Sequence, residues 1–190
     1  MIDALRQDRP GEHLELVHRL DRETSGCLVL ARNGRALAHL SARFREGAVR
    51  KFYLCLMCGR MPQAVLEVDA PMARHRNDSE SRVEVDEAGK PSLTRFRLLQ
   101  QLDDYSYVEA ELLTGRTHQI RAHARHLGLP LAGDPKYADR KSLKDSRKLG
   151  LNRVFLHAHR LAVESPAGEV LEFEAPLPDA LRVVLDTLEG

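Results

Sequence analysis

A dense polar segment, residues 18–26, stands between two apolar stretches and holds residue types that can do chemistry. It reads His-Arg-Leu-Asp-Arg-Glu-Thr-Ser-Gly, so that Asp21 is flanked by Arg19 and Arg22. Nearby positive charge favours the ionised form of a carboxyl group. An ionised Asp21 suits a nucleophile or a base better than a general acid. Charged turns are also common on protein surfaces, so a hairpin with paired surface charges remains an alternative for this segment alone.

A second polar segment, residues 113–123, reads Leu-Thr-Gly-Arg-Thr-His-Gln-Ile-Arg-Ala-His. Gly115 permits a tight turn, and the helix expected after it would present free N–H groups and the positive end of its dipole. Arg116 and Arg121 bracket this helix end. The pattern therefore indicates a site for an anion, either a phosphate or a carboxylate of the protein itself. A well-capped surface helix is the alternative.

The rest of the sequence predicts many short strands and few helices, which favours an α+β fold with a mixed, mostly antiparallel sheet and flanking helices. The pattern lacks the regular strand–helix alternation of a doubly wound fold. We expect helices at 35–46, 117–127 and 179–188, with Thr117 as the N-cap of the second. We expect strands at 14–17, 27–31, 52–57, 65–68, 94–102, 106–113, 155–163 and 169–173. The polar stretch 73–90 is expected to be a long loop or an exposed hairpin around 82–85, and 140–148 a basic connection.

Composition and charge fit one globular domain that works inside the cell. Three cysteines are too few for a disulfide framework, and no apolar run approaches the length of a membrane span, so we expect a cytoplasmic protein. Residues 114–160 hold eleven Lys or Arg against three acids, whereas residues 161–190 hold seven acids against one Arg. This asymmetry suggests a basic face that follows phosphates, although a solvated basic loop explains it equally well.

Two further patterns favour metal binding only weakly. Cys55 and Cys58 have the spacing of half a zinc site, but residues three apart on a strand point to opposite faces and no second pair exists. His157 and His159 would share one strand face, yet no further ligand lies at a recognisable spacing. We therefore expect no metal.

Taken together, the two polar segments resemble the two long motifs of the RluA-type RNA pseudouridine synthases. His-Arg-Leu-Asp followed by Thr-Ser-Gly is similar to the catalytic motif of that family, and Gly-Arg-Thr-His-Gln-Ile-Arg-x-His to its second motif. Shorter motifs follow in the family's usual order at residues 51–54, 89–96, 133–137 and 156–158. The resemblance covers about residues 14–177. It is strongest to the RluC branch, which acts on bacterial large-subunit ribosomal RNA, because of residues 89–92 and 150–153.

The resemblance implies a set of roles for individual residues. Asp21 would be the essential aspartate, Arg121 the basic residue that pairs with it, and Tyr53 the aromatic residue that stacks on the target base. Arg19 would fill the gap that a flipped nucleotide leaves in the RNA, and Ile120 would pack beside the catalytic site. Further RNA contacts are expected from His18, Arg22, Arg116 and His118. The implied reaction needs no cofactor, the implied partner is large-subunit ribosomal RNA, and we expect a monomer.

Two other classes of function remain as alternatives. The chain could be a catalytically silent RNA-binding module of the same fold, although Asp21, Tyr53 and Arg121 are all intact. A metal-dependent hydrolase is the less favoured alternative. We expect residues 1–190 to be one catalytic domain. Family members usually carry an additional upstream strand, and the RluC branch an S4-type RNA-binding domain; neither has a counterpart here, so we expect a truncated chain with weaker RNA affinity.

Overall fold

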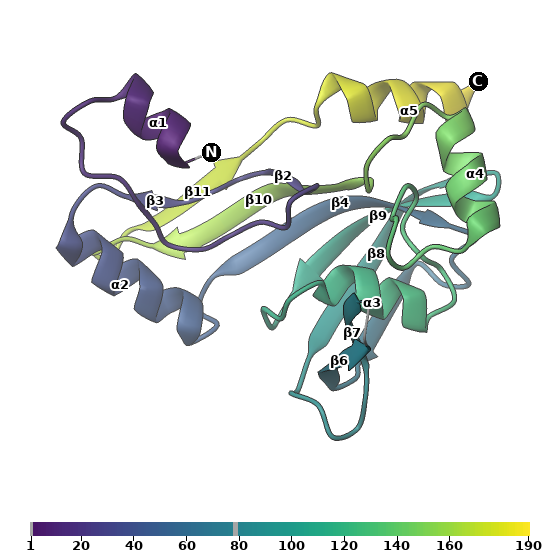
Figure 1. Ribbon diagram of the computed structural model, residues 1–190, viewed down its shortest axis with the longest axis horizontal. Helices are drawn as coiled ribbons and strands as arrows, with labels where there is room; N and C mark the ends of the chain where they lie inside the picture. Colours follow the sequence, from purple (N-terminus) through teal and green to yellow (C-terminus); the bar gives the residue numbers. More distant parts are fainter. Residues whose placement is uncertain (1, 78–79) are drawn as a thin grey trace.

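A mixed sheet forms the centre of the computed structural model, which describes residues 2–77 and 80–190 (Figure 1). Within these residues the sheet has seven strands in the order β11-β10-β4-β9-β8-β5, with β2 beside β10. Every pair is antiparallel except β2 with β10, which is parallel. The strands are β2 Ser25–Gly26, β4 Arg50–Cys58, β5 Val65–Asp69, β8 Leu93–Leu102, β9 Tyr105–Leu112, β10 Leu156–Glu164 and β11 Val170–Glu174.

Five helices lie around this sheet in the described part of the chain: α1 Ile2–Asp8, α2 Gly34–Arg45, α3 Gln119–His126, α4 Arg140–Lys148 and α5 Asp179–Glu189. Alternate residues of a strand point to opposite faces of a sheet. On β4, Cys55 is buried in the core that contains Ile120 of α3, whereas Leu56 is buried in the core that contains Leu181 of α5. Helices α3 and α5 therefore cover opposite faces of the sheet.

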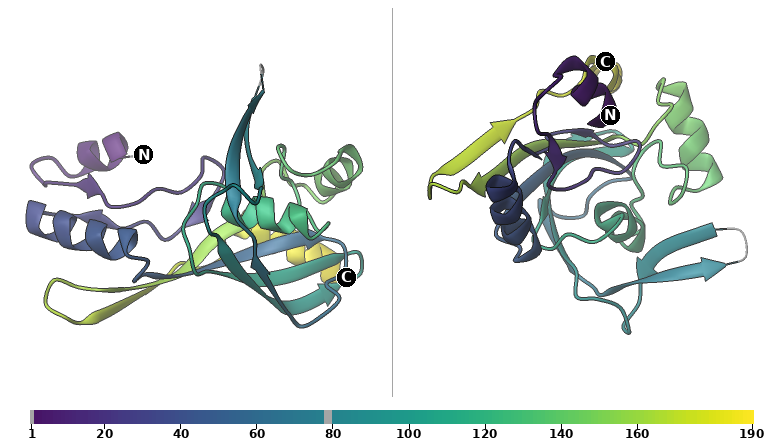
Figure 2. Two further views of the ribbon diagram at one scale, coloured as in Figure 1. Left: turned by 90° about the horizontal axis from the view of Figure 1, so that it is seen from below. Right: turned by 60° about the vertical axis from the view of Figure 1, so that its left-hand side comes forward.

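Two small two-stranded sheets complete the fold. β1 (Glu15–Leu16) pairs with β3 (Leu30–Ala31), and β6 (Met72–Asn77) pairs with β7 (Glu80–Val85). The β6–β7 hairpin stands out from the body on the side of the sheet that carries α3 (Figure 2). The hairpin expected around 82–85 is confirmed, and residues 78–79 lie outside the described residues.

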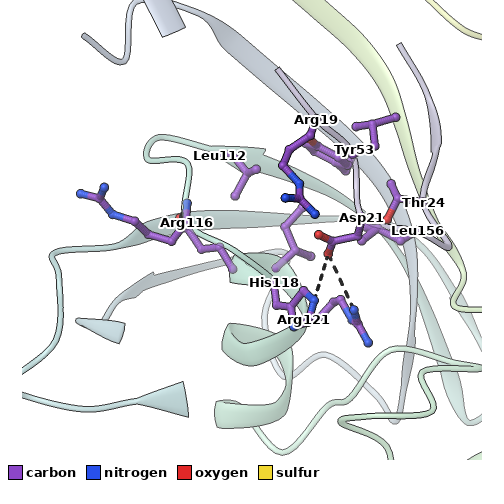
Figure 3. A pocket seen from close by; sticks show the side chains of 12 residues that line it. Arg19, Asp21, Thr24, Tyr53, Leu112, Arg116, His118, Arg121 and Leu156 are labelled. Carbon is purple, nitrogen blue, oxygen red and sulfur yellow. Dashed lines mark hydrogen bonds and ion pairs between the residues drawn. The ribbon is translucent and has the colours of Figure 1, made fainter. Parts of the chain in front are cut away.

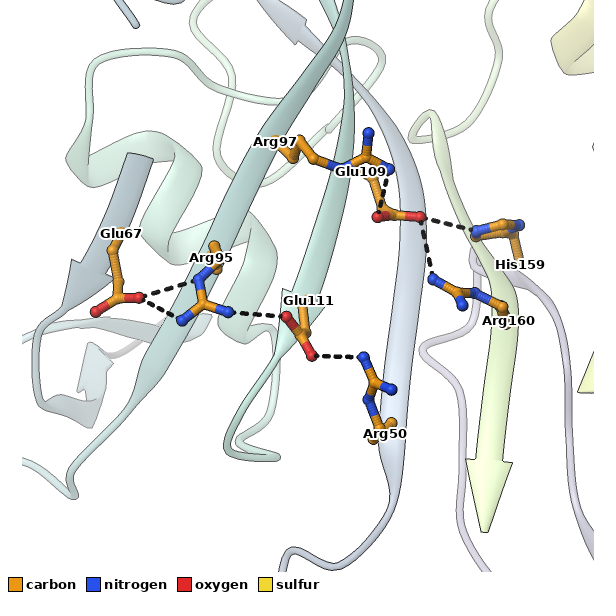
Figure 4. Close-up of polar contacts among 8 residues, drawn as sticks. All are labelled: Arg50, Glu67, Arg95, Arg97, Glu109, Glu111, His159 and Arg160. Atoms are coloured by element: carbon orange, nitrogen blue, oxygen red, sulfur yellow. Dashed lines mark hydrogen bonds and ion pairs between the residues drawn. The ribbon is translucent and has the colours of Figure 1, made fainter. Parts of the chain in front are cut away.

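The α5-side face carries a network of ion pairs that runs across the sheet from β5 to β10 (Figure 4). Glu109 accepts a hydrogen bond from Arg97 at 2.9 Å and lies 3.2 Å from His159. Arg95 bridges Glu67 and Glu111 at 3.0 and 3.2 Å. Burial raises the pKa of Glu109, but the hydrogen bonds from Arg97 and His159 and nearby arginine charges outweigh it and hold that pKa below its ordinary value.

The α+β class and the mostly antiparallel sheet are confirmed, while three local predictions were wrong or incomplete. Residues 140–148 form helix α4, capped by the Asp139 carboxylate, which accepts from Ser142 N at 2.8 Å, and are not an irregular connection. Thr117 is not the N-cap of α3: His118 occupies that position with a left-handed φ of 55° and no side-chain cap. Helix α1 was not anticipated, because its seven residues are too few for apolar periodicity to identify a helix, and none of them is buried.

Candidate active site

A pocket opens between the turn at residues 19–24, the middle of β4 and the N-terminus of α3 (Figure 3). Both long sequence motifs contribute to it, although nearly a hundred residues separate them along the chain. The residues that line it are Arg19, Leu20, Asp21, Thr24, Tyr53, Leu112, Arg116, His118, Gln119, Ile120, Arg121 and Leu156. The pocket therefore combines apolar walls with one carboxylate and several cationic or titratable groups.

The backbone around Asp21 is fixed by a tight turn and a strand. The Thr24 N–H donates to the Asp21 carbonyl at 2.9 Å, which closes the turn. The next two residues form β2 and pair with β10. Gly26 has a φ of 116°, and a Cβ there would lie 2.1 Å from the Ala158 carbonyl oxygen. Only glycine permits this approach, so the Thr-Ser-Gly end of the motif sets where Asp21 lies.

Two side chains from the C-terminal half hold the same turn from outside. Arg153 donates to the Glu23 carbonyl at 2.7 Å and to Ser25 Oγ at 2.9 Å. His157 Nε2 donates to the Ala175 carbonyl at 3.0 Å, so its Nδ1 accepts from Ser25 Oγ at 2.9 Å. Burial lowers the pKa of His157, which favours this neutral form.

Arg121 faces two carboxylates with different parts of its guanidinium group. Nε and Nη2 donate to the two oxygens of Asp134 at 2.8 and 2.7 Å, while Nη1 lies 3.7 Å from Asp21 Oδ2. Arg121 is 7% exposed and Asp134 is fully buried. Burial lowers the pKa of Arg121, but the hydrogen bonds and charge of Asp134, together with the charge of Asp21, raise it above its ordinary value. Asp134 thus fixes a permanent positive charge opposite Asp21.

His118 lies on the other side of Asp21, with Nε2 3.8 Å from Asp21 Oδ2. Its Nδ1 lies 3.1 Å from the Tyr137 hydroxyl, which in turn donates to the Val83 carbonyl of β7 at 2.9 Å. Burial lowers the pKa of His118, and it outweighs the opposing charge of Asp21. Tyr137 therefore links the β6–β7 hairpin to the wall of the pocket.

Tyr53 and Ile120 form apolar parts of the wall. Tyr53 comes from β4, and burial together with the charge of Asp21 raises the pKa of its hydroxyl to about 12, so the ring stays neutral. Ile120 is buried at the start of α3. Arg19 and Arg116 are exposed at the rim, and Figure 3 shows the Arg19 side chain above the Asp21 carboxylate.

The structure brings most of the sequence-predicted site residues together and leaves two outside. The residues that share the pocket are Asp21, Arg121, Tyr53, Arg19, Arg116, His118 and Ile120. His18 instead stacks on Phe44 of α2 at 4.5 Å, and its Nε2 accepts from the Val29 N–H. Burial lowers its pKa to about 4, so it is neutral. Arg22 is exposed and does not line the pocket.

The sequence did not predict the contacts of the residues that support the site: Asp134, Tyr137, Arg153 and His157. All four fall in the short motifs at 133–137, 150–153 and 156–158, but the spacing of those motifs gives no indication of what the side chains contact. The one local signal was the position of Asp134, an acid next to an apolar run and Gly133. A buried acid in such surroundings needs a cationic partner.

The weaker metal patterns do not converge in the part of the chain that the structure describes. Cys55 is buried in the α3-side core and Cys58 packs beside the α5-side core, so the pair points to opposite faces, as expected. His157 contacts Ser25, whereas His159 contacts Glu109. Among the described residues, no three His, Cys, Asp or Glu side chains are grouped as metal ligands. No helix of this part is long and apolar enough to cross a membrane.

The mixed sheet with its flanking helices has the fold of two solved human RNA pseudouridylate synthase domain proteins. The sequence model of the RNA pseudouridylate synthase family matches residues 2–126, and the chain belongs to this family. It is 44% identical over 186 residues to "Ribosomal large subunit pseudouridine synthase C" of Vibrio parahaemolyticus, covering 97% of this chain and 58% of that protein. With the protein of the same name from Haemophilus influenzae it shares 42% over 191 residues, covering 99% and 59%.

Among solved structures, the chain is similar to Human RNA Pseudouridylate Synthase Domain Containing 1, with a TM-score of 0.79 and 29% identity. The match covers 98% of this chain and 83% of the human one. The resemblance to the RluA-type synthases and their RluC branch is thereby confirmed. The chain spans less than two thirds of the length of the curated relatives named above.

Proposed function

We propose that this chain is the catalytic domain of an enzyme that converts uridine to pseudouridine in large-subunit ribosomal RNA. The observation that carries the proposal is the Asp21 carboxylate, held on a closed turn 3.7 Å from an arginine that buried Asp134 fixes in place. Relatives that match nearly the whole chain are named for this activity. The proposed partner is therefore ribosomal RNA, and the proposed location is the cytoplasm.

The reaction breaks the N1–C1′ bond of uridine, turns the base and joins C5 to C1′, after which C5 loses its proton to solvent and N1 gains one from it. Asp21 would act on the flipped nucleotide as a nucleophile or as a base. Arg121 would keep the Asp21 carboxylate aimed at the nucleotide, because Asp134 holds the guanidinium group rigid. The reaction involves no redox change and no transfer to a second molecule, so these side chains suffice.

Reaching the base requires flipping it out of the RNA, which costs a few kcal/mol. Tyr53 offers a neutral ring for stacking in the pocket wall, and base–aromatic stacking is worth about 1–3 kcal/mol. Arg19 is exposed at the rim above Asp21, where it can enter the space that the base leaves. Together these two contacts would offset the energy of flipping.

The test compares the chain with its Asp21→Ala variant on protein-free large-subunit ribosomal RNA that lacks pseudouridine. Modified sites are mapped by carbodiimide labelling and primer extension. We expect new stops with the wild type and none with the variant. RNA that the wild type binds but never modifies would contradict the proposal and favour a silent RNA-binding module.

A further inference from the structure

Helix α4 is strongly basic, and its charge is unevenly distributed around the helix. Five of its nine residues are Lys or Arg, and all five are exposed. Residues 140, 144 and 147 lie on one face, because they are separated by four and three positions. Residues 141, 145 and 148 lie on the adjacent face by the same rule. The two faces therefore carry different sets of charges.

The second face is partly neutralised, because one carboxylate faces two lysines. Asp145 lies 3.6 Å from Lys141 Nζ and 2.7 Å from Lys148 Nζ. On the first face Arg140, Lys144 and Arg147 make no ion pair or side-chain hydrogen bond with any residue that the structure describes. We call these three residues the α4 stripe.

Stability of the helix explains only part of the stripe, namely Arg147 in the last turn, where the helix dipole favours positive charge. Arg140 occupies the first turn, where the helix dipole disfavours positive charge, and that turn contains no acid. The inner side of α4 is held by Ser146, whose hydroxyl accepts from Gly133 N–H at 2.9 Å and donates to the Ser142 carbonyl. The outward charges contribute nothing to this contact. These charges therefore either bind a partner outside the chain or have no effect on stability or binding.

The helix is attached at both ends to the walls of the candidate active site. Just before α4, Asp134 holds Arg121, and just after it Arg153 donates to the Glu23 carbonyl in the Asp21 turn. Figure 1 shows α4 at the end of the sheet, and Leu149, directly after α4, packs beside the core that contains Leu181 of α5. The stripe is thus a row of cations, about 10 Å long at 1.5 Å per residue, on a support fixed to the pocket.

We propose that the α4 stripe binds phosphates of the RNA that flanks the target uridine. The proposal rests on the proposed function, because it takes RNA as the substrate. Lysine and arginine contacts to phosphates give affinity without sequence preference and release bound counterions. The stripe would then position the RNA over the pocket without taking part in the chemistry.

The test compares two double variants that each remove two positive charges from α4. Arg140→Gln/Arg147→Gln removes the ends of the stripe, and Lys141→Gln/Lys148→Gln removes the paired lysines as the matched control. Glutamine keeps the helix propensity of both residue types. Dissociation constants for a transcript of large-subunit ribosomal RNA are measured at several salt concentrations, with melting curves to check folding.

For the stripe variant we expect weaker RNA binding and a salt dependence, d log K/d log[salt], that is shallower by about 1.5. In the control variant, the loss of RNA affinity and the change in this salt dependence should each be less than about a third of those in the stripe variant. Single-turnover modification at saturating RNA should be unchanged in both variants. Equal losses of RNA affinity in the two variants would mean that the helix attracts RNA through its overall charge rather than through the stripe. This result would overturn the proposal. Unchanged RNA binding in the stripe variant would also overturn it, and an acidic protein would then be the partner to seek.

These outcomes are separable from the proposed function. A wild type that binds RNA through the stripe and forms no pseudouridine would support the stripe and contradict the activity. If the wild type and both double variants form pseudouridine and bind RNA equally, the activity is supported and the stripe proposal is contradicted.

Discussion

Arg121 sits between two aspartates, and replacing each by asparagine should have very different effects on stability. Asp134→Asn removes the charge of a fully buried partner that makes two hydrogen bonds to Arg121. Breaking a buried ion pair from one side costs about 3–5 kcal/mol, and the amide oxygen keeps one hydrogen bond, so we expect about 3 kcal/mol. For a chain of this size that lowers the melting temperature by about 6–12 °C.

Asp21→Asn should have almost no effect on stability. Its carboxylate is 24% exposed and lies 3.7 Å from Arg121, too far for a hydrogen bond, so its loss costs less than about 1 kcal/mol. The activity should show the opposite order: Asp21→Asn abolishes it, whereas Asp134→Asn retains a reduced rate because the carboxylate of Asp21 remains. Thermal and urea unfolding measure the first effect, and single-turnover pseudouridine formation measures the second.

A third variant controls for the loss of a surface ion pair. Glu67→Gln removes the exposed partner of Arg95 and should change stability by less than about 0.5 kcal/mol. Equal destabilisation by Asp134→Asn and Asp21→Asn would refute the division of roles between the two carboxylates. So would an Asp134→Asn variant that melts at the wild-type temperature.

Three further variants test the supports of the site and the sheet. Arg153→Lys loses the forked contact to the turn, so we expect kcat to fall by about 10-fold to 100-fold with KM for RNA unchanged; a change confined to KM would contradict a positioning role. Gly26→Ala forces a Cβ against the Ala158 carbonyl at a positive φ, and urea unfolding should show a loss of about 1–3 kcal/mol or more; wild-type stability would mean that β2 can move without cost. Glu109 has a folded-state pKa below its ordinary value, so its contribution to stability is present above the unfolded-state pKa and is lost as the pH falls through the folded-state pKa. Glu109→Gln should therefore cost about 1 kcal/mol near pH 7 and nothing at strongly acid pH, and an equal cost at both would refute the linkage.

Apolar periodicity in the sequence predicted the elements that bury one apolar face. In α2, Leu40 is buried, and Gly47 with a φ of 75° follows the helix at its C-terminal end, close to the expected stop. Helix α4 gave no such signal, because its inner face holds Leu143 and two serines rather than an apolar row. Apolar periodicity cannot predict a helix that is held by a cap and by hydroxyl hydrogen bonds.

The sequence motifs identified which segments meet at the pocket, but not which way each side chain points. His18 belongs to the same motif as Asp21, yet it turns inward onto Phe44. The motifs also did not predict that Asp134 is the nearer partner of Arg121, since that contact depends on how the loop before α4 packs. Tertiary packing sets the orientation of these side chains, and the spacing of residues in the sequence does not predict it.

We expect the Asp21 carboxylate of this chain to drive uridine isomerisation in RNA. Tritium release from ribosomal RNA labelled at C5 of uridine measures this step, because the C5 proton leaves only when C5 bonds to C1′. Wild type and Asp21→Asn are compared in single turnover, after matched melting temperatures and matched RNA binding have been established. Release by the wild type and none by Asp21→Asn is the predicted result. Release by both at the same rate, or by neither despite bound RNA, would contradict this role of Asp21.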